Sequence, residues 1–318
     1  MLQHTDAQFD EVLTKRAVAL LEDRTDFAVV NGAIPMIPTT VFNGNYKVWK
    51  AADFRRRNIE KRANGAEFKR VNIGVEEKSF SCEQEGYEIP VADRNRLENE
   101  MEDTTAKMVE DAYAQFDIRL AEKLTVANFK YHKQGNATAD KGAGKFVKWD
   151  LAGSNPIADI KAFKAEIKER LGVNPDSLLI TEDVYTALTE NATILARLRT
   201  DADKEITTAK LAQFFGLDNI YVMAGAETKS AEGQDAEIGA IKSNVALLYY
   251  KGKVAGATAP SAVKCFYNTN TYGAGTNGII IQTYREEKIT ADIARVVQDF
   301  TIVVSMADGA TLLTDVIG

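Results

Sequence analysis

Apolar and polar positions follow the most regular pattern between Asp93 and Leu124, a stretch that contains neither glycine nor proline. Apolar or small residues recur there in steps of three and four, so they share one side of an α-helix and leave a charged side opposite. Pro90 excludes helix before it, and Asp93 can cap the N-terminus. The pattern predicts a helix roughly 45 Å long, a spine against which other elements pack. The residues on its apolar side are Leu97, Met101, Thr105, Met108, Ala112, Phe116, Leu120 and Leu124.

The segments before this helix predict a short helix, an extended arm and a hairpin. Residues 6–21 carry apolar side chains at helical spacing. Residues 29–45 contain two prolines and two glycines, so we expect an extended arm that lies on other elements and outside the core. Residues 46–75 have strand-like ends around Asn64-Gly65, which favours a tight turn and predicts a long hairpin. From the charge pattern alone, a hairpin bound to a partner and a solvated hairpin fit equally well.

A second lobe with α/β texture is predicted after the glycine-rich polar loop at 131–146. Asn155, Pro156 and Gly172 supply the N-cap, first-turn and stop signals of a helix. Further helices are expected at 182–188, 192–198 and 208–215, and strands at 177–180, 219–225 and 244–251.

The C-terminal part of the chain is predicted to be rich in β-structure. Long strands are expected from Gly278 and from Ile293, and a last short strand ends the chain. No helix follows that could cover these strands, so they are expected to return and pack on the long helix. The predicted fold class is therefore α+β.

Composition indicates a folded protein with a sizeable core. The chain has 318 residues, of which 45% are hydrophobic, and this length favours two linked lobes. No apolar run approaches the about 18 residues of a membrane span, and the N-terminus carries acids where a signal peptide needs basic and apolar residues. A cytoplasmic protein without a membrane contact is expected. Cys82 and Cys265 give no paired motif and are interpreted as free thiols.

Charge is unevenly distributed along the chain. The net charge of -7 argues against a protein that grips nucleic acid through a polycationic face. From Lys47 to Lys78 there are 10 basic and 5 acidic residues, whereas Asp93 to Lys123 contains 5 basic and 9 acidic residues. A basic hairpin therefore precedes an acidic helix.

Motifs that carry chemistry are weak, and we predict no enzyme, no metal and no cofactor. The only histidines are His4 and His132. Two histidines this far apart in the sequence make a catalytic triad or a histidine-based metal site improbable. Residues 273–278 match GxGxxG, but a strand pattern follows where a dinucleotide site needs a helix. Gly144-Lys145 lacks the other phosphate-loop residues, and the acids at 201–205 lack the turn glycine and final glutamate of a calcium loop.

The ordered set of these features resembles the major capsid protein of tailed bacteriophages, the Hong Kong phage type of fold shared with encapsulins. The most specific stretches are Asn174 to Leu198, Ala209 to Glu227 and NVALLYYKG from Asn244. The resemblance implies an N-terminal arm, an extended β-hairpin loop, a spine helix with peripheral β-strands, and an α/β axial domain. The implied divisions are 1–45 (arm), 46–90 (extended loop), 91–149 (peripheral domain with spine helix and linker), 150–284 (axial domain) and 285–318 (returning peripheral strands).

The same resemblance implies a structural protein that assembles with itself into hexamers and pentamers of an icosahedral shell around phage double-stranded DNA, without sequence-specific binding. It would be made in the bacterial host cytoplasm and reside in the virion capsid. A separate scaffolding protein, a portal and decoration proteins are the expected partners. One relative joins subunits through a Lys–Asn bond, but no asparagine follows Asn277 here, so non-covalent assembly is expected.

The residues predicted to contact a neighbouring subunit lie in and beside the basic hairpin, and acidic surface on an adjacent subunit is their expected counterpart. Two alternatives stay open: an encapsulin-like compartment, and a soluble α/β nucleotide-binding enzyme that uses the loop at Gly273. The predicted contact residues are Trp49, Arg55, Arg56, Arg57, Lys61, Arg62, Lys69 and Arg70.

Overall fold

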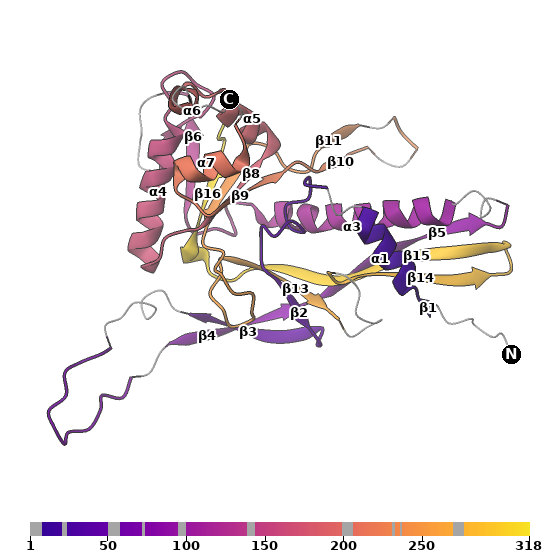
Figure 1. Cartoon of the computed structure of the whole chain (residues 1–318), viewed down its shortest axis with the longest axis horizontal. Helices are drawn as coiled ribbons and strands as arrows, with labels where there is room; N and C mark the ends of the chain where they lie inside the picture. The colour runs from indigo at the N-terminus through magenta and orange to yellow at the C-terminus, as the bar shows by residue number, and fades with distance from the viewer. Residues whose placement is uncertain are drawn as a thin grey trace.

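A computed structural model describes residues 8–20, 24–49, 58–71, 74–94, 100–138, 144–198, 206–230, 233–235, 237–269 and 277–318. A β-sheet covered by one long helix, a second lobe of sheet and helices, and a projecting hairpin make up the molecule (Figure 1). The elements up to the second lobe are β1 (Gln8–Phe9), α1 (Glu11–Leu20), β2 (Met36–Thr39), β3 (Asn43–Trp49), β4 (Val75–Ser81), β5 (Glu83–Ala92), α3 (Glu100–Lys123), β6 (His132–Asn136) and β7 (Lys145–Val147).

The remaining elements form most of the second lobe and the C-terminal strands. They are α4 (Pro156–Leu171), β8 (Ser177–Thr181), α5 (Glu182–Glu190), α6 (Ala192–Leu198), α7 (Thr208–Phe215), β9 (Asn219–Met223), β10 (Ala226–Thr228), β11 (Ile238–Ala240), β12 (Val245–Tyr249), β13 (Val263–Asn268), β14 (Ile279–Glu286), β15 (Ala291–Val304), the 3-10 turn η2 (Ala307–Gly309) and β16 (Ala310–Thr314).

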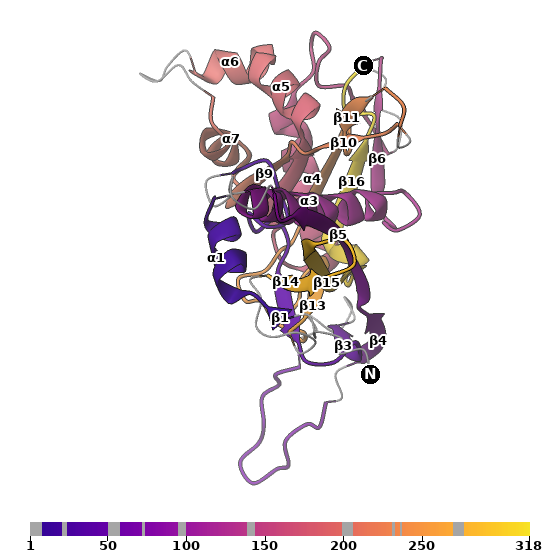
Figure 2. The same ribbon diagram turned by 90° about the vertical axis from the view of Figure 1, so that its right-hand side faces the viewer.

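Helix α3 occupies most of the predicted long helix and covers one face of the first sheet. In that sheet the strand order is β1-β14-β15-β13-β2, and β5 pairs with β15 as well. Phe116 of α3 packs on Phe300 of β15, with ring centroids 4.4 Å apart. The expectation that the late strands return to this helix is therefore confirmed for β14 and β15 (Figure 2).

The predicted start of the long helix falls beside residues that the structure does not describe. The described helix begins at Glu100, and residues 95–99 lie outside the described part of the chain. Asp93, the predicted N-cap, follows the end of β5 and binds the guanidinium of Arg285. An ion pair with the β14–β15 hairpin thus occupies the carboxylate that the sequence assigned to the helix terminus.

The second sheet has the strand order β7-β6-β16-β12-β8-β9 and carries α4, α5 and α7 against it. The predicted helix signals are confirmed at α4, where the Asn155 side chain accepts from the Ala158 amide and Gly172 ends the helix at φ 74°. Every residue of β8 and β12 is buried. These strands read as continuous apolar runs because both of their faces are covered.

The two sheets draw on interleaved parts of the chain. Strand β16 pairs with β12 and β6 of the second lobe, although it falls in the range 285–318 assigned to returning peripheral strands. Strands β13 and β14 each pair with β15 in the first sheet. Both begin within residues 150–284, the range predicted to form the axial domain. The five-part domain division stays a prediction, and strand pairing crosses its boundaries.

The segment before β2 belongs to the core, so the expectation that residues 29–45 lie outside it is wrong for their first part. Val29, Ala33 and Ile34 are at most 1% exposed, and they join the cluster beneath α3. Tyr249 of β12 donates to the carbonyl of Ala33. The apolar side chains and this buried hydrogen bond outweigh the preference of a proline-containing segment for the surface.

The predicted hairpin is present and projects from the body (Figures 1 and 2). Strands β3 and β4 pair in register from Asn43 with Ser81 to Trp49 with Val75. The turn falls at Asn64-Gly65, where Gly65 has φ 84°. Residues 58–71 continue beyond the paired strands without ladder pairing.

No described helix is long and apolar enough to cross a membrane.

Candidate functional site

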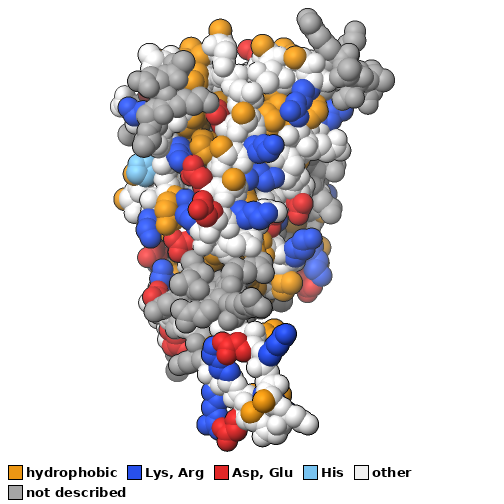
Figure 3. All heavy atoms as spheres, turned by 90° about the vertical axis from the view of Figure 1, so that its left-hand side faces the viewer, with side chains coloured by type: hydrophobic (Ala, Val, Ile, Leu, Met, Phe, Trp, Pro, Cys, Tyr) orange, Lys and Arg blue, Asp and Glu red, His pale blue; other side chains and the backbone are white. Residues whose placement is uncertain are grey.

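The far part of the hairpin, residues 58–71, is the candidate site and is called the hairpin tip below. All of its residues but one are exposed. Two of them are large and apolar, because Ile59 is 89% and Phe68 is 77% exposed. Figure 3 shows hydrophobic, basic and acidic side chains together on this projection. Neither side chain belongs to an apolar cluster among the described residues.

Four of the predicted contact residues lie on the hairpin tip. Lys69 forms an ion pair with Glu60, and the Arg62 guanidinium lies over the Phe68 ring, 4.2 Å from its centroid. Lys61 and Arg70 are exposed and have no partner among the described residues.

The other four predicted contact residues are not placed by the structure. Arg55, Arg56 and Arg57 lie outside the described residues. Trp49 ends β3, and its side chain is likewise outside them. Their part in a subunit contact stays a prediction.

The root of the hairpin is anchored by an aromatic cluster that sequence reasoning missed. Phe80 of β4 stacks on Phe266 of β13 with ring centroids 4.2 Å apart and planes at 5°, and Tyr46 lies 5.6 Å from Phe266. A Cβ on Gly44 would lie 2.7 Å from the Phe80 ring, so glycine permits this packing. Tyr46 and Val48 share one face of their strand and alternate with the polar Asn45 and Lys47, and this alternation was the available signal.

A buried lysine lies beside this root. The Lys264 Nζ donates to the carbonyl of Ala257 at 2.9 Å and lies 5.9 Å from the centre of the Tyr46 ring. Burial lowers the pKa of Lys264 to about 8, because the charged ammonium is poorly solvated there. The root is thus a packed junction, whereas the contacts of the tip with other described residues are local.

Acids of both α3 and β5 line the contact between these two elements, and cations of the same chain bind several of them. Glu85 accepts from Arg119 at 2.7 Å and from Gln115 at 2.6 Å. Asp111 accepts from the Tyr87 hydroxyl at 2.6 Å and pairs with Lys107 at 2.7 Å. The acidic surface predicted for the long helix exists, and it is partly neutralised within the subunit.

Asp117 departs from the predicted charged side of the helix. It is fully buried and accepts the backbone N–H groups of Ala28 and Val29 at 2.8 and 2.9 Å. Burial raises its pKa to about 7, against the effect of the two hydrogen bonds. The carboxylate therefore joins the N-terminal segment to α3 and is not part of an exposed acidic face.

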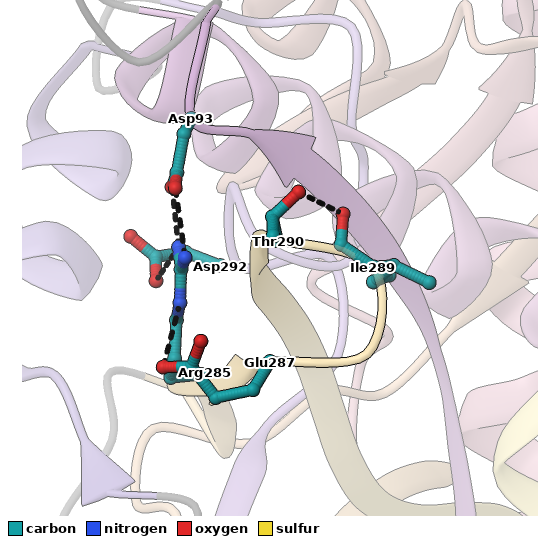
Figure 4. A network of polar contacts seen from close by, with 6 residues as sticks. All are labelled: Asp93, Arg285, Glu287, Ile289, Thr290 and Asp292. Carbon is teal, nitrogen blue, oxygen red and sulfur yellow. Dashed lines mark hydrogen bonds and ion pairs between the residues drawn. The ribbon is translucent and has the colours of Figure 1, made fainter.

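A polar network fixes the far end of the first sheet (Figure 4). Arg285 of β14 binds Asp93 at 2.7 Å, Asp292 at 3.3 Å and Glu287 at 3.4 Å. The Asp93 amide donates to the Thr290 carbonyl at 3.3 Å. These contacts hold the end of β5 against the β14–β15 turn.

Within the described residues, no group of three or more His, Cys, Asp and Glu side chains could hold a metal ion. Residues 273–276 of the GxGxxG match, and the acids at 201–205, lie outside them. Strand β14 follows the glycine loop directly, as predicted. Gly144 precedes β7 and not the helix that a phosphate loop requires.

The chain as a whole has the major capsid fold of tailed bacteriophages, an α+β fold shared with encapsulins. No family model matches the sequence, and no curated protein matches it. The fold is instead recognised from solved structures.

A phage-related protein from Bordetella bronchiseptica RB50 is 17% identical, with a TM-score of 0.72 and 98% of each chain covered. The capsid of the cyanophage P-SCSP1u is 12% identical, with a TM-score of 0.57 and coverage of 90% of this chain and 88% of that one. The SrpI encapsulin of Synechococcus elongatus PCC 7942 is 10% identical, with a TM-score of 0.54 and coverage of 94% and 95%. At these identities the similarity establishes the fold.

Proposed function

We propose that this chain is the structural subunit of a capsid shell and has no catalytic role. In the finer form of the proposal, copies assemble into hexamers and pentamers of an icosahedral shell that encloses phage double-stranded DNA. The subunit would assemble in the cytoplasm of a bacterial host and reside in the virion. The capsid fold supports this role, since the neighbours of this fold include a phage capsid and an encapsulin.

The observation that carries the proposal is the hairpin tip. It holds exposed Ile59 and Phe68, and Lys61 and Arg70, which have no partner within the described part of the chain, on an arm that projects from the body. A soluble monomer gains nothing from such an arm, whereas a neighbouring copy would bury its apolar surface and pair its charge. Closed symmetry then repeats each modest contact around a ring.

Net charge supports a container for DNA. The chain has a net charge of -7, so its surface on average repels a polyanion. A shell of such subunits would confine DNA without sequence-specific contact. A scaffolding protein, a portal and decoration proteins are the proposed further partners. Assembly is proposed to be non-covalent, so boiling in SDS should yield single subunits; a ladder of linked subunits would contradict this.

Electron microscopy of the purified chain in negative stain tests the proposed function. The intact chain should form closed shells, and a variant with residues 58–71 replaced by a short glycine-serine turn should remain folded by circular dichroism and form none. Monomers, or small oligomers other than hexamers and pentamers, in place of shells would refute the proposal. Particles filled with a separately encoded enzyme and lacking DNA would indicate an encapsulin-like compartment.

A further inference from the structure

The loop that joins β12 to β13, residues 250–262, lies beside the root of the hairpin and is called the β12–β13 loop below. Its two ends are joined, since the Ala262 amide donates to the Tyr250 carbonyl at 2.9 Å. Its middle is open to solvent at Val254, which is 70% exposed. Ala257 instead packs against the aromatic cluster at the hairpin root. The loop therefore contacts solvent on one side and the root on the other.

Lys264 joins this loop to the root through its ammonium group. The side chain leaves β13 on the same strand face as Phe266 and is 1% exposed. Its Nζ donates to the Ala257 carbonyl at 2.9 Å and lies 5.9 Å from the centre of the Tyr46 ring. The charged group thus lies between the β12–β13 loop and strand β3.

Within the described residues, few groups stabilise this buried ammonium. It has three N–H donors and forms one hydrogen bond, to Ala257. The pocket that borders it measures about 10 Å³, the lower limit for a single water molecule. The described lining of this pocket comes from β3, the β12–β13 loop and the residues after β15, and it includes no carboxylate. A loop that moved away would leave the charge buried and unpaired, which is strongly unfavourable.

We propose that Lys264 couples the β12–β13 loop to the hairpin root, so that displacement of the loop loosens the pairing of β3 with β4. Without the Ala257 carbonyl, the ammonium has to leave its site for water. Its departure removes the packing beside Tyr46, and Tyr46 belongs to β3. Contact at the exposed middle of the loop would therefore reach the hairpin. The coupling operates within one subunit, so it is independent of whether the proposed shell forms.

Hydrogen exchange of the unassembled subunit, followed by mass spectrometry, measures the coupling. Removal of residues 253–255 shortens the loop and displaces Ala257, so peptides that cover 43–49 and 75–81 should exchange at least about tenfold faster at pH 7. In a Lys264→Met background the same deletion should change this exchange by no more than about twofold, because methionine fills the space and needs no carbonyl partner. Equal acceleration in the two backgrounds, or none in the intact one, would overturn the inference.

Lys253→Met is the matched control for the loss of a lysine. Lys253 is an exposed residue of the same loop, and its replacement should leave exchange at the hairpin root unchanged within about twofold. Acceleration by Lys253→Met as large as that caused by the deletion would attribute the effect to surface charge and overturn the inference.

The pH profile of the root distinguishes a coupled charge from simple packing. Burial lowers the pKa of Lys264 to about 8, and opening of the root restores its ordinary value, so the closed root becomes more stable as the pH rises above 8. The titratable groups that face Lys264 are Tyr46 and Lys47 of β3 and the Cys82 thiol of the same cluster. Burial raises the pKa of Tyr46 and raises that of Cys82 to about 11, so both stay largely protonated up to pH 9.

Protection factors of the root, corrected for intrinsic exchange, should therefore rise about tenfold from pH 7 to pH 9 in the intact chain. They should stay within about twofold in Lys264→Met. A tenfold rise that persists in Lys264→Met, or its absence from the intact chain, would overturn the inference.

Discussion

Replacing the buried carboxylate Asp117 by asparagine should remove a specific pH dependence from the stability of the subunit. The Asp117 side chain is fully buried on α3 and accepts the backbone N–H groups of Ala28 and Val29. Those groups begin a short turn closed by the bond from the Ala33 amide to the Ala28 carbonyl at 2.9 Å. The N-terminal segment is thereby held on α3 through a buried ionisable group.

The direction of the effect follows from the pKa of Asp117. Burial raises this pKa from 3.8 to about 7 in the folded subunit, so the folded state binds the proton more tightly than the unfolded state does. The resulting stabilisation is complete below about pH 4 and is lost as the pH rises through about 7. This rise in the pKa corresponds to about 4 kcal/mol of folding free energy, of which about 3 kcal/mol is lost between pH 5 and pH 8.

Urea unfolding of the unassembled subunit at pH 5 and pH 8 measures this contribution. The intact chain should lose about 3 kcal/mol more than Asp117→Asn over that interval. Asparagine should also lower stability at pH 5, because its amide group faces one of the two backbone N–H donors and leaves that donor unsatisfied, at a cost of about 1–3 kcal/mol.

Asp103→Asn is the matched control, because Asp103 lies exposed on the same helix. This variant should keep the full pH dependence of the intact chain. If Asp117→Asn lost as much stability between pH 5 and pH 8 as the intact chain and the control do, the reasoning about desolvation at Asp117 would be refuted.

Two further substitutions test the packing that positions the hairpin and the edge strand. Phe80→Ala removes the ring stacked on Phe266 and should lower the free energy of unfolding by about 3–5 kcal/mol. The loss should be visible as rapid proteolytic cleavage within the hairpin. Unchanged cleavage would contradict an anchored root. Gly86→Ala places a Cβ 2.1 Å from a β15 carbonyl oxygen and should cost about 3 kcal/mol or more in thermal unfolding. Gly256→Ala, whose Cβ would meet only an ordinary contact at 3.7 Å, should be nearly neutral, and equal melting of the two variants would argue against the close approach.

Local signals in the sequence predicted individual elements well. Asn155, Pro156 and Gly172 determined the ends of α4 because caps and stop residues act within one turn. Asn64-Gly65 likewise marked the hairpin turn, which forms between adjacent residues. Where the physical cause is local, a single sequence contains enough information to identify it.

Pairing between distant parts of the chain was not predictable. β16 lies between β12 and β6 in its sheet, and no local pattern distinguishes that choice from pairing with β15. Asp117 carries no sequence signal for burial, because its partners are backbone N–H groups of a segment far away in sequence. Gln298 looks like an ordinary polar residue of a strand until α3 is seen to cover it.

The contrast between the root and the tip of the hairpin explains why one arm can serve both folding and association. Tyr46, Phe80 and Phe266 form a cluster of their own on the first sheet, so the direction of the arm is set before any partner is present. Among the described residues, the side-chain contacts of the tip are the pair of Lys69 with Glu60 and the stack of Arg62 on Phe68. A pre-oriented arm loses less conformational entropy on binding. Contacts that are individually weak can then support association of many copies, and changes at the tip should alter assembly while changes at the root alter the subunit itself.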